Sequence, residues 1–205
     1  MISDYIHPMT TVSEIIRSCD TGLARGLSLQ LIAKLNRMTK TPLLVKIDDP
    51  SVDVSSKSVN PYLQPEAAAQ LIVAAKRRGQ VIKLNSCLRT TVQQHIIRRQ
   101  FEAGLCGITA AALPGKSNHE RGAAIDIQDP DDWRSELEDQ NWSKLGIWDN
   151  MHYDFWNCRK DIAALQISAF QMLWNENNPN NLIAVDGSYG ATTAAKIDLS
   201  PVDGW

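Results

Sequence analysis

The sequence has no long apolar run. No stretch approaches the roughly 20 consecutive apolar residues that a membrane-spanning helix needs, so we expect no such helix. The first ten residues include Asp4 and Pro8 and have no basic segment followed by an apolar run, which is the pattern of a secretory signal. We therefore expect no signal peptide, and the route of any export is not visible here.

Charge of one sign is also scarce. The 21 Lys and Arg residues nearly balance the 23 Asp and Glu residues, and the net charge is −2. No basic groove with interleaved aromatic residues can be recognised, so binding to nucleic acid is not expected. With 205 residues, 43% of them apolar, the chain can bury one good core and a small appendage. We expect it to be a monomer.

The four cysteines include no Cys-x-x-Cys pair, which argues against a structural zinc site of the thiolate type. Either they are buried thiols or some of them form disulfides, and four cysteines allow three pairings between which the sequence cannot choose. The residues are Cys19, Cys87, Cys106 and Cys158.

The pattern of helices and strands predicts an α+β fold. The clearest helix begins with Pro65 in its first turn and ends at Gly79. Other helices are expected from Thr11, from Ser28 to residue 38, and over 91–103, 130–139 (with Asp129 as N-cap) and 161–175. Strands are expected over 42–47, 81–86, 123–128 and 152–156. The segment 48–60 is expected to be an irregular connection. Because the order lacks regular parallel βαβ units, we expect a small antiparallel sheet flanked by helices.

Three residues form a candidate zinc site. His119, Asp126 and His152 offer two imidazoles and a carboxylate. A catalytic zinc needs three such ligands and a fourth position left open for water. Asp149 lies three residues before the last ligand and is the natural proton acceptor.

The local pattern supports this grouping. Arg121-Gly122 indicates a bend, and the run 123–128 that follows is of strand type. Period-two alternation places Asp126 on one face of this strand with small neighbours. His152 begins a second, aromatic strand, and Asp149 lies in the turn before it.

These residues carry a family resemblance. Ser-x-His-x-x-Gly-x-Ala-x-Asp over 117–126, followed by Asp-x-x-His over 149–152, resembles the zinc-dependent D-alanyl-D-alanine peptidase superfamily of bacterial cell-wall enzymes. That superfamily includes carboxypeptidases, dipeptidases and phage L-alanyl-D-glutamate endopeptidases. The block 86–90 with Gln94 is similar to the family's Ser-x-x-Arg-Ser/Thr-x-x-x-Gln block.

The resemblance implies a zinc peptidase that cuts peptidoglycan stem peptides containing D-amino acids, in the periplasm or on the cell wall. It implies His119, Asp126 and His152 as ligands of Zn²⁺, Asp149 as general base, Arg89 as the contact to substrate, and Ser117 and Gln94 as supporting polar residues. We add the aromatic Tyr153 and Trp156 as substrate-binding candidates, and Trp148 as a further residue flanking the site.

Two departures from the family pattern bear on specificity. Asp149 stands where many of the carboxypeptidases have glutamate, and the phage-type endopeptidases resemble the chain more closely there. Cys87-Leu88 stands where glycine and an aromatic residue are frequent. Carboxypeptidase and endopeptidase activity therefore both stay open. Two other readings are a non-catalytic wall-binding protein with a structural metal and the same chemistry used as a secreted toxin or lysis factor.

The last 45 residues have a different pattern. Leu-Gln at 165–166 followed by Asp-Gly-x-Tyr-Gly-x-x-Thr over 186–193 resembles a truncated peptidoglycan-binding repeat. We therefore expect a zinc peptidase domain over 1–160 and a helical tail over 161–205, which either binds the wall or only packs against the catalytic body.

Overall fold

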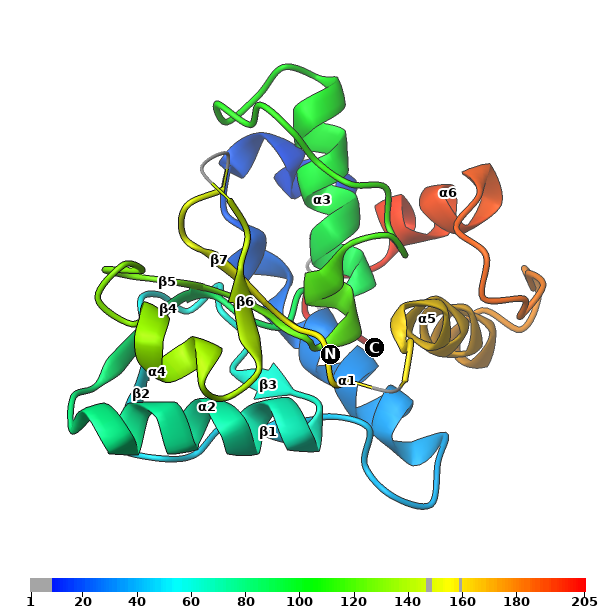
Figure 1. Ribbon diagram of the computed structural model, residues 1–205. Coiled ribbons are helices and arrows are strands. Elements are labelled where there is room, and N and C mark those ends of the chain that lie inside the picture. The colour runs from blue at the N-terminus through cyan, green and yellow to red at the C-terminus, as the bar shows by residue number, and fades with distance from the viewer. Residues whose placement is uncertain (1–8, 147–148, 159) are drawn as a thin grey trace, which may run out of the picture.

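The computed structural model describes residues 9–146, 149–158 and 160–205 and has the predicted α+β architecture (Figure 1). A five-stranded sheet has the order β2-β4-β5-β7-β6, and its strands are β2 (Val52–Val54), β4 (Ile82–Ser86), β5 (Ala124–Ile127), β6 (Trp142–Lys144) and β7 (His152–Phe155). Every neighbouring pair is antiparallel except β2 and β4. A second, two-stranded antiparallel sheet joins β1 (Val45–Lys46) to β3 (Tyr62–Leu63).

Three short strands were not predicted. β2 lies inside the segment 48–60 that we expected to be irregular, β3 lies between that segment and the helix that begins at Pro65, and β6 follows a helix in a segment without a recognised pattern. Each contains only two or three residues, which is too short for period-two alternation to be recognised in the sequence. The pairing of β2 with β4 makes the larger sheet mixed, because the chain returns through the helix that follows β3.

α2 (Pro65–Arg78) confirms the clearest helix prediction, with Gly79 at its C-cap in the left-handed region (φ 69°). It lies along one face of the larger sheet, beside α4 (Arg134–Glu138) (Figure 1). The prediction for α4 was wrong at its start. Asp129 has φ 50° and lies in a turn, so it does not cap the helix, which begins four residues after Pro130.

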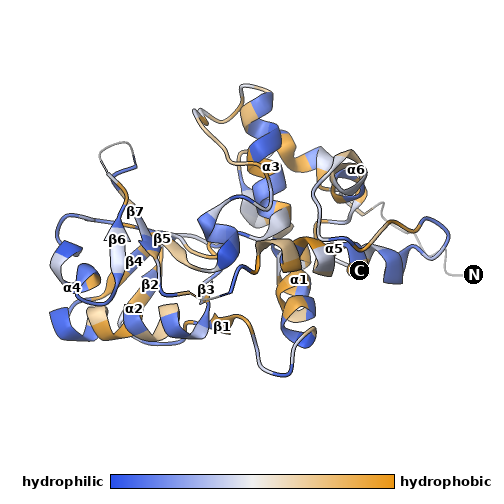
Figure 2. Ribbon diagram, turned by 45° about the vertical axis from the view of Figure 1, so that its right-hand side comes forward, coloured by the Kyte–Doolittle hydropathy of each residue, from blue (hydrophilic) through white to orange (hydrophobic). Residues whose placement is uncertain are grey.

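A group of helices lies beside the sheet (Figure 2). These are η1 (Ser13–Ser18), η2 (Thr21–Ala24), α1 (Arg25–Arg37) and α3 (Thr91–Glu102). Thr90 and Gln93 form a capping box at the start of α3. α1 starts three residues before the predicted start at Ser28, so Ser28 lies in the first turn of the helix. Its hydroxyl is 2.9 Å from the hydroxyl of Thr90.

The tail forms α5 (Ala163–Asn177) and α6 (Ala191–Leu199), which pack against the N-terminal helices. Phe170 of α5 and Leu31 of α1 belong to the same buried apolar cluster, and Figure 2 shows this helical group beside the part of the chain that holds the sheet. Backbone hydrogen bonds from Val12 to Ser200 and from Leu27 to Val202 join the two ends of the chain. The domain boundary at residue 160 stays a prediction.

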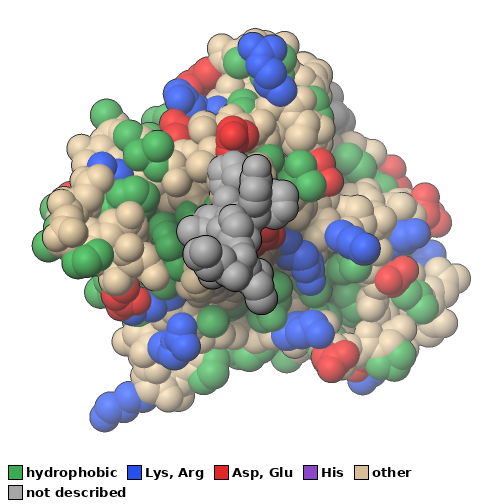
Figure 3. Space-filling model, turned by 180° about the vertical axis from the view of Figure 1, so that it is seen from behind, with side chains coloured by type: hydrophobic (Ala, Val, Ile, Leu, Met, Phe, Trp, Pro, Cys, Tyr) green, Lys and Arg blue, Asp and Glu red, His purple; other side chains and the backbone are tan. Residues whose placement is uncertain are grey.

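A buried histidine also joins the tail to α3. His95 is fully buried, and its two ring nitrogens lie 2.7 Å from the Tyr189 hydroxyl and 2.8 Å from Asp198 Oδ1. On the surface seen from behind, basic and acidic side chains are interspersed (Figure 3). None of the described helices is long and apolar enough to cross a membrane.

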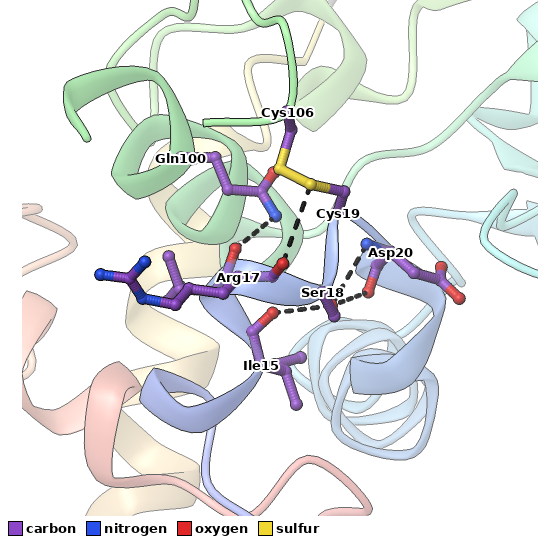
Figure 4. The surroundings of a disulfide bond; sticks show 8 residues. Ile15, Arg17, Ser18, Cys19, Asp20, Gln100 and Cys106 are labelled. Atoms are coloured by element: carbon purple, nitrogen blue, oxygen red, sulfur yellow. Dashed lines mark hydrogen bonds between the residues drawn. A yellow bond between two sulfur atoms is a disulfide. The ribbon is translucent and has the colours of Figure 1, made fainter. Parts of the chain in front are cut away.

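Cys19 and Cys106 form a disulfide that joins the end of η1 to the loop after α3 (Figure 4). Beside it, Gln100 of α3 donates a hydrogen bond to the Ile16 carbonyl at 2.9 Å. The other two cysteines, Cys87 and Cys158, are thiols. The pairing that the sequence left open is therefore one disulfide and two free cysteines.

Thiol counting tests this arrangement. Burial raises the pKa of Cys87 to about 12 and that of Cys158 to about 11, so both are protonated and unreactive at pH 8. We expect a disulfide-exchange reagent to label neither thiol rapidly in the folded protein and to label two after unfolding. After reduction, all four cysteines of the sequence should react. Four reactive thiols on unfolding without reductant would contradict the disulfide.

Removal of the tail tests its part in the core. A chain ending at residue 160 would expose the α1 side chains that α5 now covers, including Leu27, Leu31 and Leu35, all fully buried. Because loss of one large buried side chain already costs about 2–5 kcal/mol, we expect insoluble or unfolded protein. Circular dichroism and thermal melting would show this. A soluble fragment that melts cooperatively at the temperature of the full chain would contradict it.

Candidate metal centre

A short helical turn delivers the first histidine. η3 (Asn118–Arg121) contains His119 and ends at Gly122, which has φ 61°. A Cβ at this position would lie 2.6 Å from Leu44 Cδ2 and 3.3 Å from the Gln64 backbone nitrogen. The glycine of the motif is therefore required both by its left-handed backbone and by close packing.

Strand register delivers the other two residues. In the antiparallel pair of β5 and β7, Asp126 lies opposite His152, and on its other side Asp126 pairs with Ser86 of β4. The alternate residues of β5, Ile125 and Ile127, are fully buried in the core beneath the sheet. The alternation predicted for this strand is thus present, and it turns Asp126 to the face away from the core, toward His119 and His152.

Three ligand atoms meet in a small triangle. His119 Nε2 lies 3.2 Å from His152 Nδ1, His152 Nδ1 lies 3.0 Å from Asp126 Oδ1, and His119 Nε2 lies 3.4 Å from Asp126 Oδ1. Ligands about 2.0–2.1 Å from a tetrahedral zinc are separated by about 3.3–3.4 Å. The donor set and its spacing therefore fit a divalent metal of this kind, and the three residues are a group that could hold one.

The hydrogen bonds of the two imidazoles leave the inward nitrogens for the metal. His119 Nδ1 donates to the Cys87 carbonyl at 2.8 Å, so its Nε2 can accept a metal. His152 Nε2 lies 2.9 Å from Asp154 Oδ1, so its Nδ1 faces the triangle. Asp154 was not among the residues predicted from the sequence, although alternation in β7 places it on the same face as His152.

Burial and charge act against each other in this cluster. Burial raises the pKa of Asp126, but its interactions with the two histidines outweigh burial and hold the pKa well below its usual range. Burial lowers the pKa of His152, and the bonds to Asp126 and Asp154 outweigh this and raise it to about 9. Burial and the charge of Arg89 lower the pKa of His119.

Arg89 lies three residues after the end of β4, half-buried beside the cluster. Its Nη1 donates to Gln94 Oε1 at 3.0 Å, and the Gln94 amide donates to the Ala112 carbonyl at 2.7 Å. Burial lowers the pKa of Arg89, while the charges of Asp126, Glu120 and the exposed Asp149 raise it. Gln94 thus orients the guanidinium, and Arg89 lies within electrostatic reach of both Asp126 and Asp149.

A second buried carboxylate holds the loop before His119. Glu120 accepts hydrogen bonds from the backbone nitrogens of Gly115 and Ser117 and from the Thr91 hydroxyl. Burial raises its pKa to about 7, although these donors lower it. Ser117 is itself buried at the start of η3, and Glu120 had no predicted role.

The two aromatic substrate-binding candidates, Tyr153 and Trp156, lie in different surroundings. Tyr153 is fully buried in the core beneath the sheet, where its hydroxyl donates to the Pro130 carbonyl at 2.6 Å, because it alternates with His152 along β7. The structure does not bring it to the triangle. Trp156 is 67% exposed and lines a cavity of about 200 Å³ together with Asp154. Trp148 lies outside the described residues.

Comparison with known families agrees with this geometry. Residues 57–155 match the VanY family of D-alanyl-D-alanine carboxypeptidases. This segment belongs to that family. It contains the triangle together with Arg89 and Asp149, and it excludes Trp156 and the tail. No curated protein matches the chain. Membership in the family indicates peptidoglycan hydrolysis of the D-Ala-D-Ala carboxypeptidase type.

Replacement of one ligand tests the triangle as a metal site. Asp126→Ala removes the only carboxylate of the three and leaves two imidazoles, so we expect stoichiometric zinc to be lost. Metal content after dialysis, measured by mass spectrometry, would show it. Asp139→Ala is the matched control, since this exposed carboxylate pairs with Arg77 of α2. Equal zinc in both variants would exclude the triangle as the binding site.

Proposed function

We propose that the protein is a zinc-dependent peptidase that hydrolyses bonds in peptidoglycan stem peptides containing D-amino acids, at the cell wall. The observation that carries this proposal is the triangle of His119, Asp126 and His152 inside a segment of the D-alanyl-D-alanine carboxypeptidase family. The spacing of its donor atoms suits zinc, and its carboxylate and imidazole donors are those of catalytic zinc sites.

Each side chain around the triangle has a role in this chemistry. Zinc, when bound, supplies a Lewis acid and lowers the pKa of coordinated water to about 7. Asp149 accepts the proton of the attacking water and can return it to the leaving amine. Its exposed position in the turn before His152 allows a carboxylate to reach substrate without being a ligand.

Arg89 recognises the substrate in this proposal. A guanidinium presents a planar fork of donors that suits a terminal carboxylate or a developing oxyanion. Its Nη1 is already held by Gln94 at 3.0 Å, which limits the orientations that the group can take. Removal of a terminal D-Ala would use Arg89 for the carboxylate, whereas cleavage within the stem would use it for the oxyanion.

A product map distinguishes these two reactions. Purified protein would be incubated with soluble stem peptides and with peptidoglycan, with zinc and with a chelator, and the products identified by mass spectrometry. Chelator-sensitive loss of terminal D-Ala is the result that the family leads us to expect. Cutting inside the stem would establish an endopeptidase. Absence of any cleavage while zinc is demonstrably bound would overturn the proposal.

Asp149→Ala tests the general base. We expect kcat to fall about 10²–10⁴-fold, because a positioned proton acceptor contributes this much, while zinc stays bound. Steady-state kinetics with a stem peptide and metal analysis of the same sample would check both parts. Asp139→Ala serves again as the control and should keep its activity. Loss of zinc from Asp149→Ala would instead make Asp149 a ligand.

We also infer a role in wall binding for residues 161–205. The Asp-Gly turn on which the repeat resemblance rests is tightly built, which supports this inference: Asp186 Oδ1 accepts from the Ser188 backbone nitrogen at 2.8 Å, and Gln171 Oε1 accepts from the nitrogens of Asp186 and Gly187 at 3.0 Å. Gly187 has φ 67°. Substitutions on the exposed surface of this turn, rather than truncation, would separate wall binding from folding.

A further inference from the structure

A buried carboxylate beside the triangle has no part in the chemistry proposed above. Asp154 is 4% exposed and lies on β7, two residues after His152 and on the same face. Its Oδ1 receives two hydrogen bonds, from His152 Nε2 and from Asn118 Nδ2, each at 2.9 Å. A carboxylate removed from water at this position requires such donors to offset its desolvation.

His152 presents its two ring nitrogens to different groups, Nδ1 to the triangle and Nε2 to Asp154. A neutral imidazole carries one proton, and the nitrogen without the proton supplies the lone pair. An ionised carboxylate such as Asp154 only accepts hydrogen bonds, so its contact with Nε2 favours the tautomer that carries the proton there. Nδ1 faces Asp126 at 3.0 Å, on the side where a metal would be held. His119 has the opposite arrangement, with its proton on Nδ1 and Nε2 inward.

Asn118 couples the two ligand-bearing segments. It immediately precedes His119 in η3, and its amide reaches across to Asp154 on β7. The short helix η3 therefore supplies both His119, a candidate ligand, and Asn118, which donates a hydrogen bond to the carboxylate that contacts His152. Asn118 and Asp154 also line the cavity beside Trp156, on the side of His152 that faces away from the triangle.

We propose that Asp154, oriented by Asn118, is a positioning residue that makes His152 an Nδ1 ligand and strengthens metal binding. This inference rests on the proposed zinc site and adds to it two residues that act through His152. The pair holds the ring in the orientation in which its Nδ1 completes the triangle with His119 and Asp126.

Zinc affinity is the first test. Competition with a chromophoric chelator at fixed pH should show about 10–100-fold weaker zinc binding by Asp154→Ala than by the unaltered protein, which is the usual effect of removing such a partner. Asn118→Ala should show a smaller loss. Asp161→Ala is the matched control, because this exposed aspartate lines the same cavity but bonds Arg121 and contacts neither histidine. Equal affinities of the Asp154→Ala and Asp161→Ala variants would overturn the inference.

The ligating nitrogen is the second test and needs no variant. In the zinc-loaded, ¹⁵N-labelled protein, long-range proton–nitrogen spectra should show His152 bound through Nδ1 with a proton on Nε2, and His119 bound through Nε2. Ligation of His152 through Nε2 would refute the proposal directly. This result separates the role of Asp154 from the zinc site itself. The proposed zinc site would survive ligation through Nε2, whereas failure of the unaltered protein to bind zinc would exclude both.

A conservative variant separates positioning from folding. Asp154→Asn keeps the volume and offers a neutral acceptor to Nε2, so we expect zinc affinity between those of the unaltered protein and Asp154→Ala, with an unchanged melting temperature of the metal-free protein. If Asp154→Ala fails to fold, the comparison rests on Asp154→Asn. Zinc affinity of a folded Asp154→Asn equal to that of Asp161→Ala would contradict the positioning role.

Discussion

The register between β5 and β7 is the constraint on which the rest of the site depends. It places Asp126 opposite His152, so a carboxylate and an imidazole on different strands meet at 3.0 Å. A slip of one residue would turn one of the two strands over and send its polar residues into the core. The fully buried Ile125 and Tyr153, which pair in the same register, oppose such a slip because they fill the core on the other face. Core packing and site geometry are therefore two consequences of one alignment.

One of the two apolar clusters supports this alignment. α2 and α4 cover the face from which Ile125 and Tyr153 project, whereas the N-terminal helices, α3 and the tail form a separate cluster beside the sheet. The loop that carries His119 lies between the sheet and α5, where Gln166 of α5 donates to the Glu120 carbonyl. The tail thus contacts η3, the segment that carries His119, whether or not the tail also binds the cell wall. The disulfide holds the loop after α3 to η1 within the helical group.

The charges around the triangle are arranged in opposite pairs. Asp126 faces both imidazoles, and Asp154 contacts the outer nitrogen of His152. The positive charge of Arg89 interacts with the carboxylates of Asp126, Glu120 and Asp149. Because each of these charges has a partner, the attraction within the pairs offsets part of the desolvation cost of burying them beside the sheet. The same arrangement directs two lone pairs and one carboxylate oxygen toward a single point, which is the geometry that a tetrahedral metal requires.

The sequence by itself determined the α+β class, the long helices and the choice of His119, Asp126 and His152 as candidate ligands, because spacing, alternation and capping residues are local properties. α2 could be bounded from Pro65 and Gly79 alone. Only the tertiary structure decided the rest. The parallel pairing of β2 and the short β6 depend on neighbouring strands, the choice of Cys106 as partner of Cys19 depends on the packing of α3 against η1, and the removal of Tyr153 from the site depends on which face of β7 meets the core. The contact between Asn118 and Asp154 joins residues 36 positions apart, and no local pattern encodes a distance of that kind.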